Sequence, residues 1–180
     1  MRIVGGKYRS RVLAEFQGEE VRPTSDRAKE ALFNILSLKI PLSRVLDLFS
    51  GSGALGIECL SRGASSVTFN DKRAESVKLL KTNLQKLGVE SDCVQIYSHD
   101  YLVCLAQLKG AFDLILLDPP YKEEFGVLAM QEIVRRNLLA KDGVVVYERD
   151  RKFEGKIDGL TLYDERKYGR TYFAFFKKEE

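Results

Sequence analysis

The sequence predicts an α/β fold built on a doubly wound, mostly parallel sheet of seven strands. Short apolar runs at residues 45–49 and 112–117 alternate with amphipathic helical segments as far as residue 148. Near-continuous apolar strands are typical of a parallel sheet covered on both faces, and alternating strands and helices imply an open doubly wound sheet. Beyond residue 160 two strand-like runs follow each other without a helix, which predicts an antiparallel C-terminal hairpin.

Each predicted element has a local signal. Apolar residues at helical spacing run from Ala28 to Leu36, after several N-cap candidates, and Pro41 ends that segment. Gly63 and Gly88 end two later helices, as glycine does at helix C-termini. The predicted helices are residues 28–36, 54–62, 73–87, 101–108 and 125–137, and the predicted strands are 45–49, 67–70, 93–97, 112–117, 143–148, 160–163 and 172–176.

The bulk composition predicts one soluble domain. The chain has 180 residues, of which 44% are hydrophobic and 31% charged, and it contains no apolar run long enough for a transmembrane helix. The N-terminus lacks the apolar stretch of a signal peptide. Cys59, Cys93 and Cys104 are scattered and odd in number, so we expect neither a disulfide nor a metal site, and a reducing cytoplasm as the location.

The N-terminal residues 1–40 are predicted to form a basic β-ribbon and a helix appended to a catalytic core at residues 41–180. The net charge is only +3, but Lys7, Arg9 and Arg11 lie in a stretch without an acidic residue. If residues 7–11 are extended, these three side chains share one face. Either a solvated edge strand or a phosphate-binding ribbon explains this pattern.

A glycine loop follows the first strong strand and predicts a cofactor site. Gly51, Gly53 and Gly56 match the spacing of a dinucleotide fingerprint, and Asp71 stands 20 residues beyond Gly51, where a ribose-binding carboxylate belongs. A nicotinamide enzyme is therefore one interpretation. Asp47, at the strand end before the glycines, favours another, because a carboxylate repels a pyrophosphate but attracts the ammonium and sulfonium of S-adenosylmethionine.

The ends of two further strands reach the same rim. Asp100 and Tyr101 follow the third strand, where they could bind and flank an adenine, while His99 is predicted to be a loop residue. The fourth strand ends in the motif Asp-Pro-Pro-Tyr at residues 118–121. Proline fixes the backbone of this segment. The resulting cluster of rigid acceptors beside an aromatic ring suits the exocyclic amine of a planar base.

Taken together, these features resemble class I S-adenosylmethionine-dependent methyltransferases with a Rossmann-like sheet. More narrowly, the chain resembles the RsmD family of 16S ribosomal RNA guanine-N2 methyltransferases, on the stretches 2–11, 22–27, 31–36 and 168–171. The family usually has a carboxylate where this chain has Asn70, and either Asn70 or Asp71 could hold the cofactor ribose.

The resemblance implies methylation of a guanine N2 amine in small-subunit ribosomal RNA, within a subunit or an assembly intermediate. A DNA adenine-N6 methyltransferase, an NAD-dependent oxidoreductase and a non-catalytic RNA-binding module remain alternatives. The predicted catalytic residues are Asp118, Pro119, Pro120 and Tyr121. The predicted cofactor contacts are Asp47, Phe49, Ser50, Gly51, Ser52, Gly53, Asn70, Asp71, Lys72, Asp100 and Tyr101. The predicted RNA contacts are Lys7, Tyr8, Arg9, Arg11, Arg22, Thr24, Arg27, Lys122 and Arg170.

Overall fold

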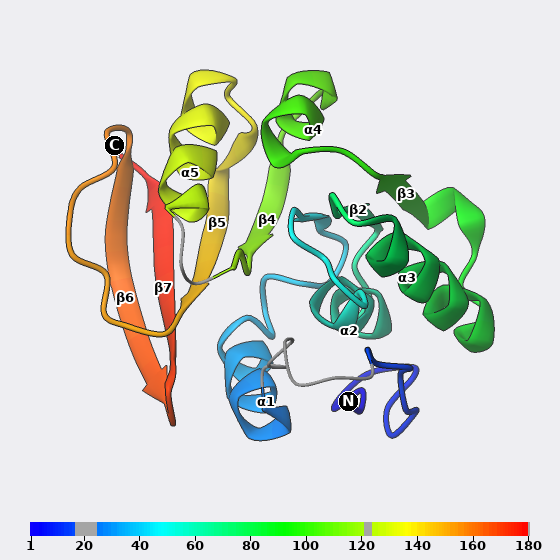
Figure 1. Ribbon diagram of the computed structural model, residues 1–180. Coiled ribbons are helices and arrows are strands. Elements are labelled where there is room, and N and C mark those ends of the chain that lie inside the picture. Colours follow the sequence, from blue (N-terminus) through cyan, green and yellow to red (C-terminus); the bar gives the residue numbers. More distant parts are fainter. Residues whose placement is uncertain (17–24, 121–123, 180) are drawn as a thin grey trace.

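A computed structural model describes residues 1–16, 25–120 and 124–179. Within these residues, a seven-stranded sheet with the order β3-β2-β1-β4-β5-β7-β6 is covered by helices on both faces (Figure 1). The strands are β1 (Arg44–Asp47), β2 (Ser66–Asn70), β3 (Val94–Tyr97), β4 (Phe112–Leu117), β5 (Leu139–Arg149), β6 (Leu160–Tyr168) and β7 (Thr171–Lys178). The α-helices are α1 (Asp26–Ile35), α2 (Ala54–Ser61), α3 (Ala74–Leu87), α4 (Tyr101–Gln107) and α5 (Phe125–Arg135).

The sheet confirms the predicted fold class. Strands β1 to β5 pair in parallel, and β7 pairs antiparallel with both β5 and β6. The strand order reverses between β1 and β4, which are neighbours in the sheet. In open sheets of this kind, ligands bind outside the carboxyl ends of the strands at this reversal. The fold therefore places a candidate site at the ends of β1 and β4.

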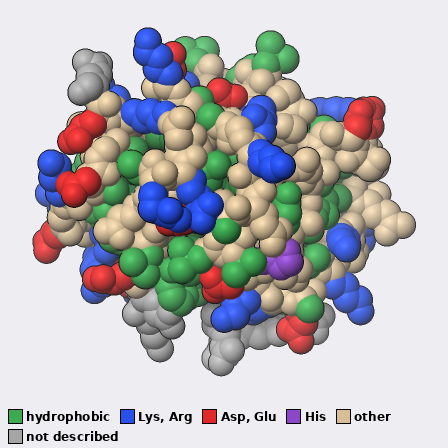
Figure 2. Space-filling view, turned by 90° about the horizontal axis from the view of Figure 1, so that it is seen from above, with side chains coloured by type: hydrophobic (Ala, Val, Ile, Leu, Met, Phe, Trp, Pro, Cys, Tyr) green, Lys and Arg blue, Asp and Glu red, His purple; other side chains and the backbone are tan. Residues whose placement is uncertain are grey.

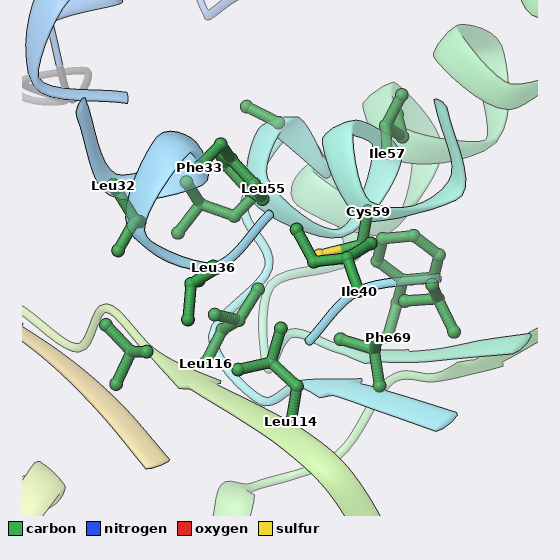
Figure 3. Close-up of a cluster of buried hydrophobic side chains, with 14 of the residues drawn as sticks. Leu32, Phe33, Leu36, Ile40, Leu55, Ile57, Cys59, Phe69, Leu114 and Leu116 are labelled. Carbon is green, nitrogen blue, oxygen red and sulfur yellow. The ribbon is translucent and has the colours of Figure 1, made fainter. Parts of the chain in front are cut away.

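Two apolar clusters hold the helices against the sheet. On one face, Leu32 and Phe33 of α1 and Ile57 of α2 belong to one buried cluster with Leu114 and Leu116 of β4 (Figure 3). On the other face, α4 and α5 bury apolar side chains against β1, β4, β5 and β7. Each fully buried apolar side chain contributes about 1.5–3 kcal/mol, so both layers are fixed to the sheet.

Several element boundaries differ from the prediction. Strand β5 begins at Leu139 rather than Gly143, and the β4–β5 register shifts between Phe112 and Leu114. The expected connection at residues 164–170 is mostly strand, because β6 continues to Tyr168 in register with β7. Pairing supplies the backbone hydrogen bonds there; Arg166 and Lys167 face solvent, while Asp164 and Glu165 are half-buried.

The N-terminal segment is a loop rather than an extended ribbon. Only Arg2 and Val12 form an antiparallel bridge in the described part of this segment, and residues 7–10 form turns, with φ of 70° at Ser10. The prediction that Lys7, Arg9 and Arg11 share a strand face is therefore wrong. The backbone N–H groups of Arg9 and Arg11 bond to the carbonyls of Gly6 and Tyr8 within the turns, so they are not available to a strand partner. All three basic side chains are nevertheless exposed.

A buried glutamate anchors this N-terminal loop to α2. The carboxylate of Glu58 accepts hydrogen bonds from the backbone N–H of Val4 at 2.9 Å and of Gly5 at 2.8 Å. It also pairs with Lys29 of α1 at 3.4 Å and with Arg62 at 2.9 Å. The side chains of Lys29 and Glu58 are both fully buried. The loop, α1 and α2 are therefore held by one desolvated charge cluster.

None of the helices in residues 1–16, 25–120 and 124–179 has both the length and the apolar character needed to cross a bilayer. The N-terminal loop, α1 and the turn between β6 and β7 lie along the lower edge of the view in Figure 1.

Replacing Glu58 by Gln should lower the free energy of unfolding by about 3–5 kcal/mol in urea denaturation, because Lys29 would stay buried without a full counter-charge. The amide nitrogen of Gln would also face backbone donors. The matched control is Asp164→Asn, which breaks the exposed pair with Arg166 on β6. It should cost less than about 1 kcal/mol. Equal losses in the two variants would contradict the anchoring role.

Candidate active site

The loop between β1 and α2 exposes its backbone at one glycine. Gly51 and Gly53 have φ of 52° and 85°, which favours glycine at both positions. A Cβ added at Gly51 would meet no atom within 4 Å, whereas one at Gly53 would lie 2.3 Å from Leu80. One at Gly56 would lie 2.3 Å from Phe69. Gly51 therefore faces open space for a ligand, while Gly53 and Gly56 allow α2 to pack closely.

Asp47 lies beneath this loop and is almost fully buried. Its Oδ2 atom accepts a hydrogen bond from the Gly56 N–H at 2.9 Å. Its Oδ1 atom is also buried but has no hydrogen-bond partner among the described residues. Burial raises the pKa of Asp47 to about 7; the Gly56 N–H opposes this shift and Asp71 adds to it. A buried carboxylate oxygen without a donor fits a cationic ligand group.

At the carboxyl end of β2, Asn70 and Asp71 make hydrogen bonds to different parts of the rim. The Asn70 amide donates to the carbonyls of Leu48 and His99, each at 3.1 Å, and accepts from the His99 N–H at 3.2 Å. Asn70 is almost fully buried and joins β2 to the ends of β1 and β3. The Asp71 carboxylate instead accepts from the Gly51 N–H at 2.9 Å. Asp71 is therefore the residue of this pair that holds the glycine loop.

An aromatic cluster lies at the end of β3. Asp100 caps α4 by accepting from the Leu102 N–H at 3.0 Å. The Tyr101 ring is only 6% exposed and packs between Phe49, with centroids 5.4 Å apart, and Phe125, at 5.2 Å. Tyr101 therefore supports Phe49, whose side chain is the more accessible one beside the loop. Ser50 is buried, while Ser52 and Lys72 lie nearer the surface of the rim.

The segment after β4 brings a second carboxyl to the same edge. Asp118 is partly exposed, Pro119 is buried and Pro120 is exposed. Although the residue is partly exposed, its carboxyl group is desolvated, which raises the pKa of Asp118 well above its ordinary value, and the neighbouring carboxyls of Glu148 and Asp47 raise it further. The predicted residues Tyr121 and Lys122 lie outside the described residues.

The predicted RNA contacts are accessible wherever the structure describes them. The side chains of Lys7, Arg9, Arg11, Arg27 and Arg170 are exposed, and Tyr8 is half-buried, while Arg22 and Thr24 lie outside the described residues. Figure 2 shows the opposite face of the molecule, seen from above, where Lys and Arg side chains are interspersed with acidic and apolar ones.

Two residues near the site were missed in the sequence. Asn83 of α3 is fully buried; its amide exchanges hydrogen bonds with the backbone of Ala14 and donates to the Ser52 carbonyl at 3.0 Å. It thereby ties the N-terminal segment to the glycine loop. Its position beside Leu84 on the inward face of a predicted helix was a usable signal. Glu148, at the end of β5, is almost fully buried beside Asp118.

Comparisons with known proteins identify relatives across the whole chain. Residues 1–177 match the family described as conserved hypothetical protein 95. The ribosomal RNA small subunit methyltransferase D of Haemophilus influenzae is 37% identical over 98% of this chain and 93% of its own length. The solved structure of the Escherichia coli protein yhhF has a TM-score of 0.88 at 28% identity and covers 99% of this chain and 98% of its own. The Podospora anserina methyltransferase PaMTH1, solved with SAH bound, shares the fold alone, at 13% identity and a TM-score of 0.71 over 88% of this chain and 80% of its own.

Replacing Asp47 by Asn should change how stability depends on pH. Because the folded-state pKa of Asp47 is raised to about 7, its protonated form favours the folded state. That contribution is complete below about pH 4, the pKa of an unperturbed Asp, and is lost as the pH rises through 7. Urea denaturation between pH 4 and 8 should show a smaller decline in the free energy of unfolding for Asp47→Asn than for the unmodified chain. If the free energy of unfolding falls equally in both proteins between pH 4 and 8, the folded-state pKa of Asp47 is not raised.

Proposed function

Because this chain belongs to the conserved hypothetical protein 95 family, together with the ribosomal RNA small subunit methyltransferase D proteins, we propose that it methylates a guanine N2 amine in small-subunit ribosomal RNA, with S-adenosylmethionine as the methyl donor. The observation that carries this proposal is the buried Oδ1 atom of Asp47, which lacks a donor beneath the exposed backbone of Gly51. Asp118 lies at the same edge of the sheet.

The residues of the rim fit the parts of S-adenosylmethionine. Asp47 offers a buried anionic acceptor to the ammonium group, and Gly51 lets the backbone approach the ligand. Asp71 keeps acceptor capacity for ribose hydroxyls, because two N–H donors occupy only part of its carboxylate. Phe49 and Asp100 flank the place proposed for adenine. Bound there, S-adenosylmethionine supplies an electrophilic methyl group on a sulfonium.

The segment at residues 118–120 is proposed to hold the target amine. Its two prolines fix the backbone, so Asp118 and the Pro119 carbonyl present acceptors in one geometry. They orient the N2 lone pair toward the methyl carbon and stabilise the positive charge that develops on nitrogen. The N–C bond forms as the S–C bond breaks, sulfur keeps the electron pair, and nitrogen then releases one proton. Asp118 can accept that proton, since its surroundings raise its pKa.

The base must leave its stack before it reaches this segment, at a cost of a few kcal/mol. Stacking on Tyr121 would offset about 1–3 kcal/mol of that cost, a role that stays a prediction because Tyr121 lies outside the described residues.

The appendage at residues 1–40 is proposed to bind the RNA backbone through its exposed cations, with Arg170 as a further contact. A ribosomal substrate agrees with a cytoplasmic location.

The same observations disfavour the alternatives. A nicotinamide dinucleotide would bring its pyrophosphate to a loop that already has Asp47 beneath it and Asp71 on it, and like charges repel. A DNA adenine-N6 methyltransferase shares the Asp-Pro-Pro-Tyr chemistry, but a relative that is 37% identical over 98% of this chain is named a ribosomal RNA small subunit methyltransferase.

Small ribosomal subunits from a strain that lacks the enzyme, incubated with labelled S-adenosylmethionine, should yield N2-methylguanosine in nucleoside mapping. The Asp118→Ala variant should transfer methyl groups at least about a hundredfold more slowly, because a preorganised acceptor is lost. Calorimetry should show its affinity for S-adenosylmethionine nearly unchanged. A loss of cofactor affinity equal to the loss of rate would contradict the role of Asp118 at the target base.

Replacing Lys7, Arg9 and Arg11 together by Ser should weaken RNA binding and reduce its salt dependence. Each lost phosphate contact lowers the slope of log K against log salt by about 0.7–0.9, so three contacts change it by about 2. The control is the triple replacement of Lys39, Lys109 and Lys141, exposed lysines toward the amino ends of the strands. If both triple variants change the slope equally, the N-terminal loop is only a solvated surface.

A further inference from the structure

Three carboxyl side chains converge on one face of the sheet at the carboxyl ends of neighbouring strands. Asp47 of β1 pairs with Leu116 of β4, and Leu116 pairs with Val146 of β5. Side chains two residues apart along a strand share a face. Asp118 and Glu148 each follow Leu116 and Val146 by two residues, so they continue the face on which Asp47 lies. This face is the one covered by α1, α2 and α3.

The end of β5 lies directly against the segment proposed to hold the target amine. Pro119 and Glu148 both line a hollow with a volume of about 60 Å³, whose apolar lining belongs to the α5 side of the sheet and which Asp118 does not line. The charge of Glu148 is the first neighbour to raise the pKa of Asp118, ahead of Asp47. The two carboxyls are thus close enough to act on one planar ligand.

Glu148 is held in the interior at this place. The residue is 2% exposed, and it lies beside Asp118 and Asp47 at the end of a central strand. A side chain enclosed in this way has a defined position next to the carboxyl proposed to bind the target amine.

The edges of the two purines differ at the ring atom beside the amine. In guanine the N2 amine is flanked by the N1–H group, which donates a hydrogen bond. In adenine the N6 amine is flanked by the N1 lone pair, which accepts one. An ionised carboxylate only accepts hydrogen bonds. A second carboxylate beside Asp118 would therefore attract guanine N1–H and repel the adenine N1 lone pair.

We propose that Glu148 determines base specificity, by accepting the N1–H of the guanine whose N2 amine is held by Asp118 and Pro119. This inference rests on the proposed function and deepens it. Asp118 binds the reacting amine, which both purines possess. Glu148 contacts the ring atom N1 beside it, which donates a hydrogen bond in guanine and accepts one in adenine. Asp-Pro-Pro-Tyr therefore sets the chemistry, and the end of β5 selects the base.

The test compares Glu148→Gln, Glu148→Ala and Glu148→Asp with the unmodified chain. Substrates are small subunits from a strain lacking the enzyme and single-stranded RNA containing both purines, with products identified by nucleoside mapping. In Glu148→Gln, transfer to guanine should fall, because a neutral amide oxygen replaces the carboxylate as the acceptor of N1–H. The ratio of N6-methyladenosine to N2-methylguanosine should rise, because the Gln amide can donate to adenine N1. In Glu148→Ala, which removes the acceptor, transfer to guanine should fall about 5- to 150-fold, as expected for a lost base contact of about 1–3 kcal/mol.

The other variants separate recognition from folding. Glu148→Ala should lose guanine transfer without gaining adenine transfer, and Glu148→Asp should keep guanine as the product at a reduced rate. Calorimetry should give an unchanged S-adenosylmethionine affinity in all three. The matched control is Glu165→Gln on β6, whose carboxylate accepts the Phe153 N–H at 2.8 Å, and its product ratio should not change.

The outcomes distinguish this inference from the function on which it rests. If the unmodified chain makes N2-methylguanosine and both Glu148→Gln and Glu148→Ala keep its rate and product ratio, Glu148 does not select the base. A fall in rate matched by an equal fall in cofactor affinity would also overturn its role, since the effect would then arise at the cofactor. If the unmodified chain transfers no methyl group to either RNA, both proposals fail.

Discussion

The burial of negative charge at the reversal of strand order is the constraint on which the site depends. Parallel strands end at the same edge, and side chains two residues apart share a face, so Asp47, Asp118 and Glu148 meet on one side of the sheet. Burial in low dielectric disfavours their ionised forms, and their mutual repulsion adds to that effect. A cationic ligand relieves both, which is why this edge suits a sulfonium donor and an amine that becomes positively charged.

The glycine loop is held in place by polar contacts from three directions. Asp47 fixes the start of α2 through the Gly56 N–H, and Asp71 fixes the Gly51 N–H. From the side of α3, Asn83 binds the Ser52 carbonyl and the backbone of Ala14. A loop fixed in this way needs little rearrangement to receive a ligand. The same contacts link it to the N-terminal segment proposed to bind RNA.

The buried cluster around Glu58 gives that segment a defined position. Its backbone N–H groups at Val4 and Gly5 bind a carboxylate on α2, the helix that begins at the glycine loop. Such a cluster contributes less net stability than its number of contacts suggests, because desolvation offsets much of the attraction. It does orient the segment, since a misplaced backbone would leave the charges of Glu58 and Lys29 without partners.

The sequence by itself determined the alternation of strands and helices, the glycine loop and the two motif carboxylates, because hydrophobic period, glycine and proline are local signals. It also favoured a cationic cofactor over a dinucleotide, because Asp47 stands directly before the glycine loop. Only the tertiary structure decided that residues 7–10 turn, that Asn70 bridges three strands while Asp71 holds the loop, and that Glu148 lies beside Asp118. These outcomes depend on strand register and on contacts between distant segments, which no local pattern specifies.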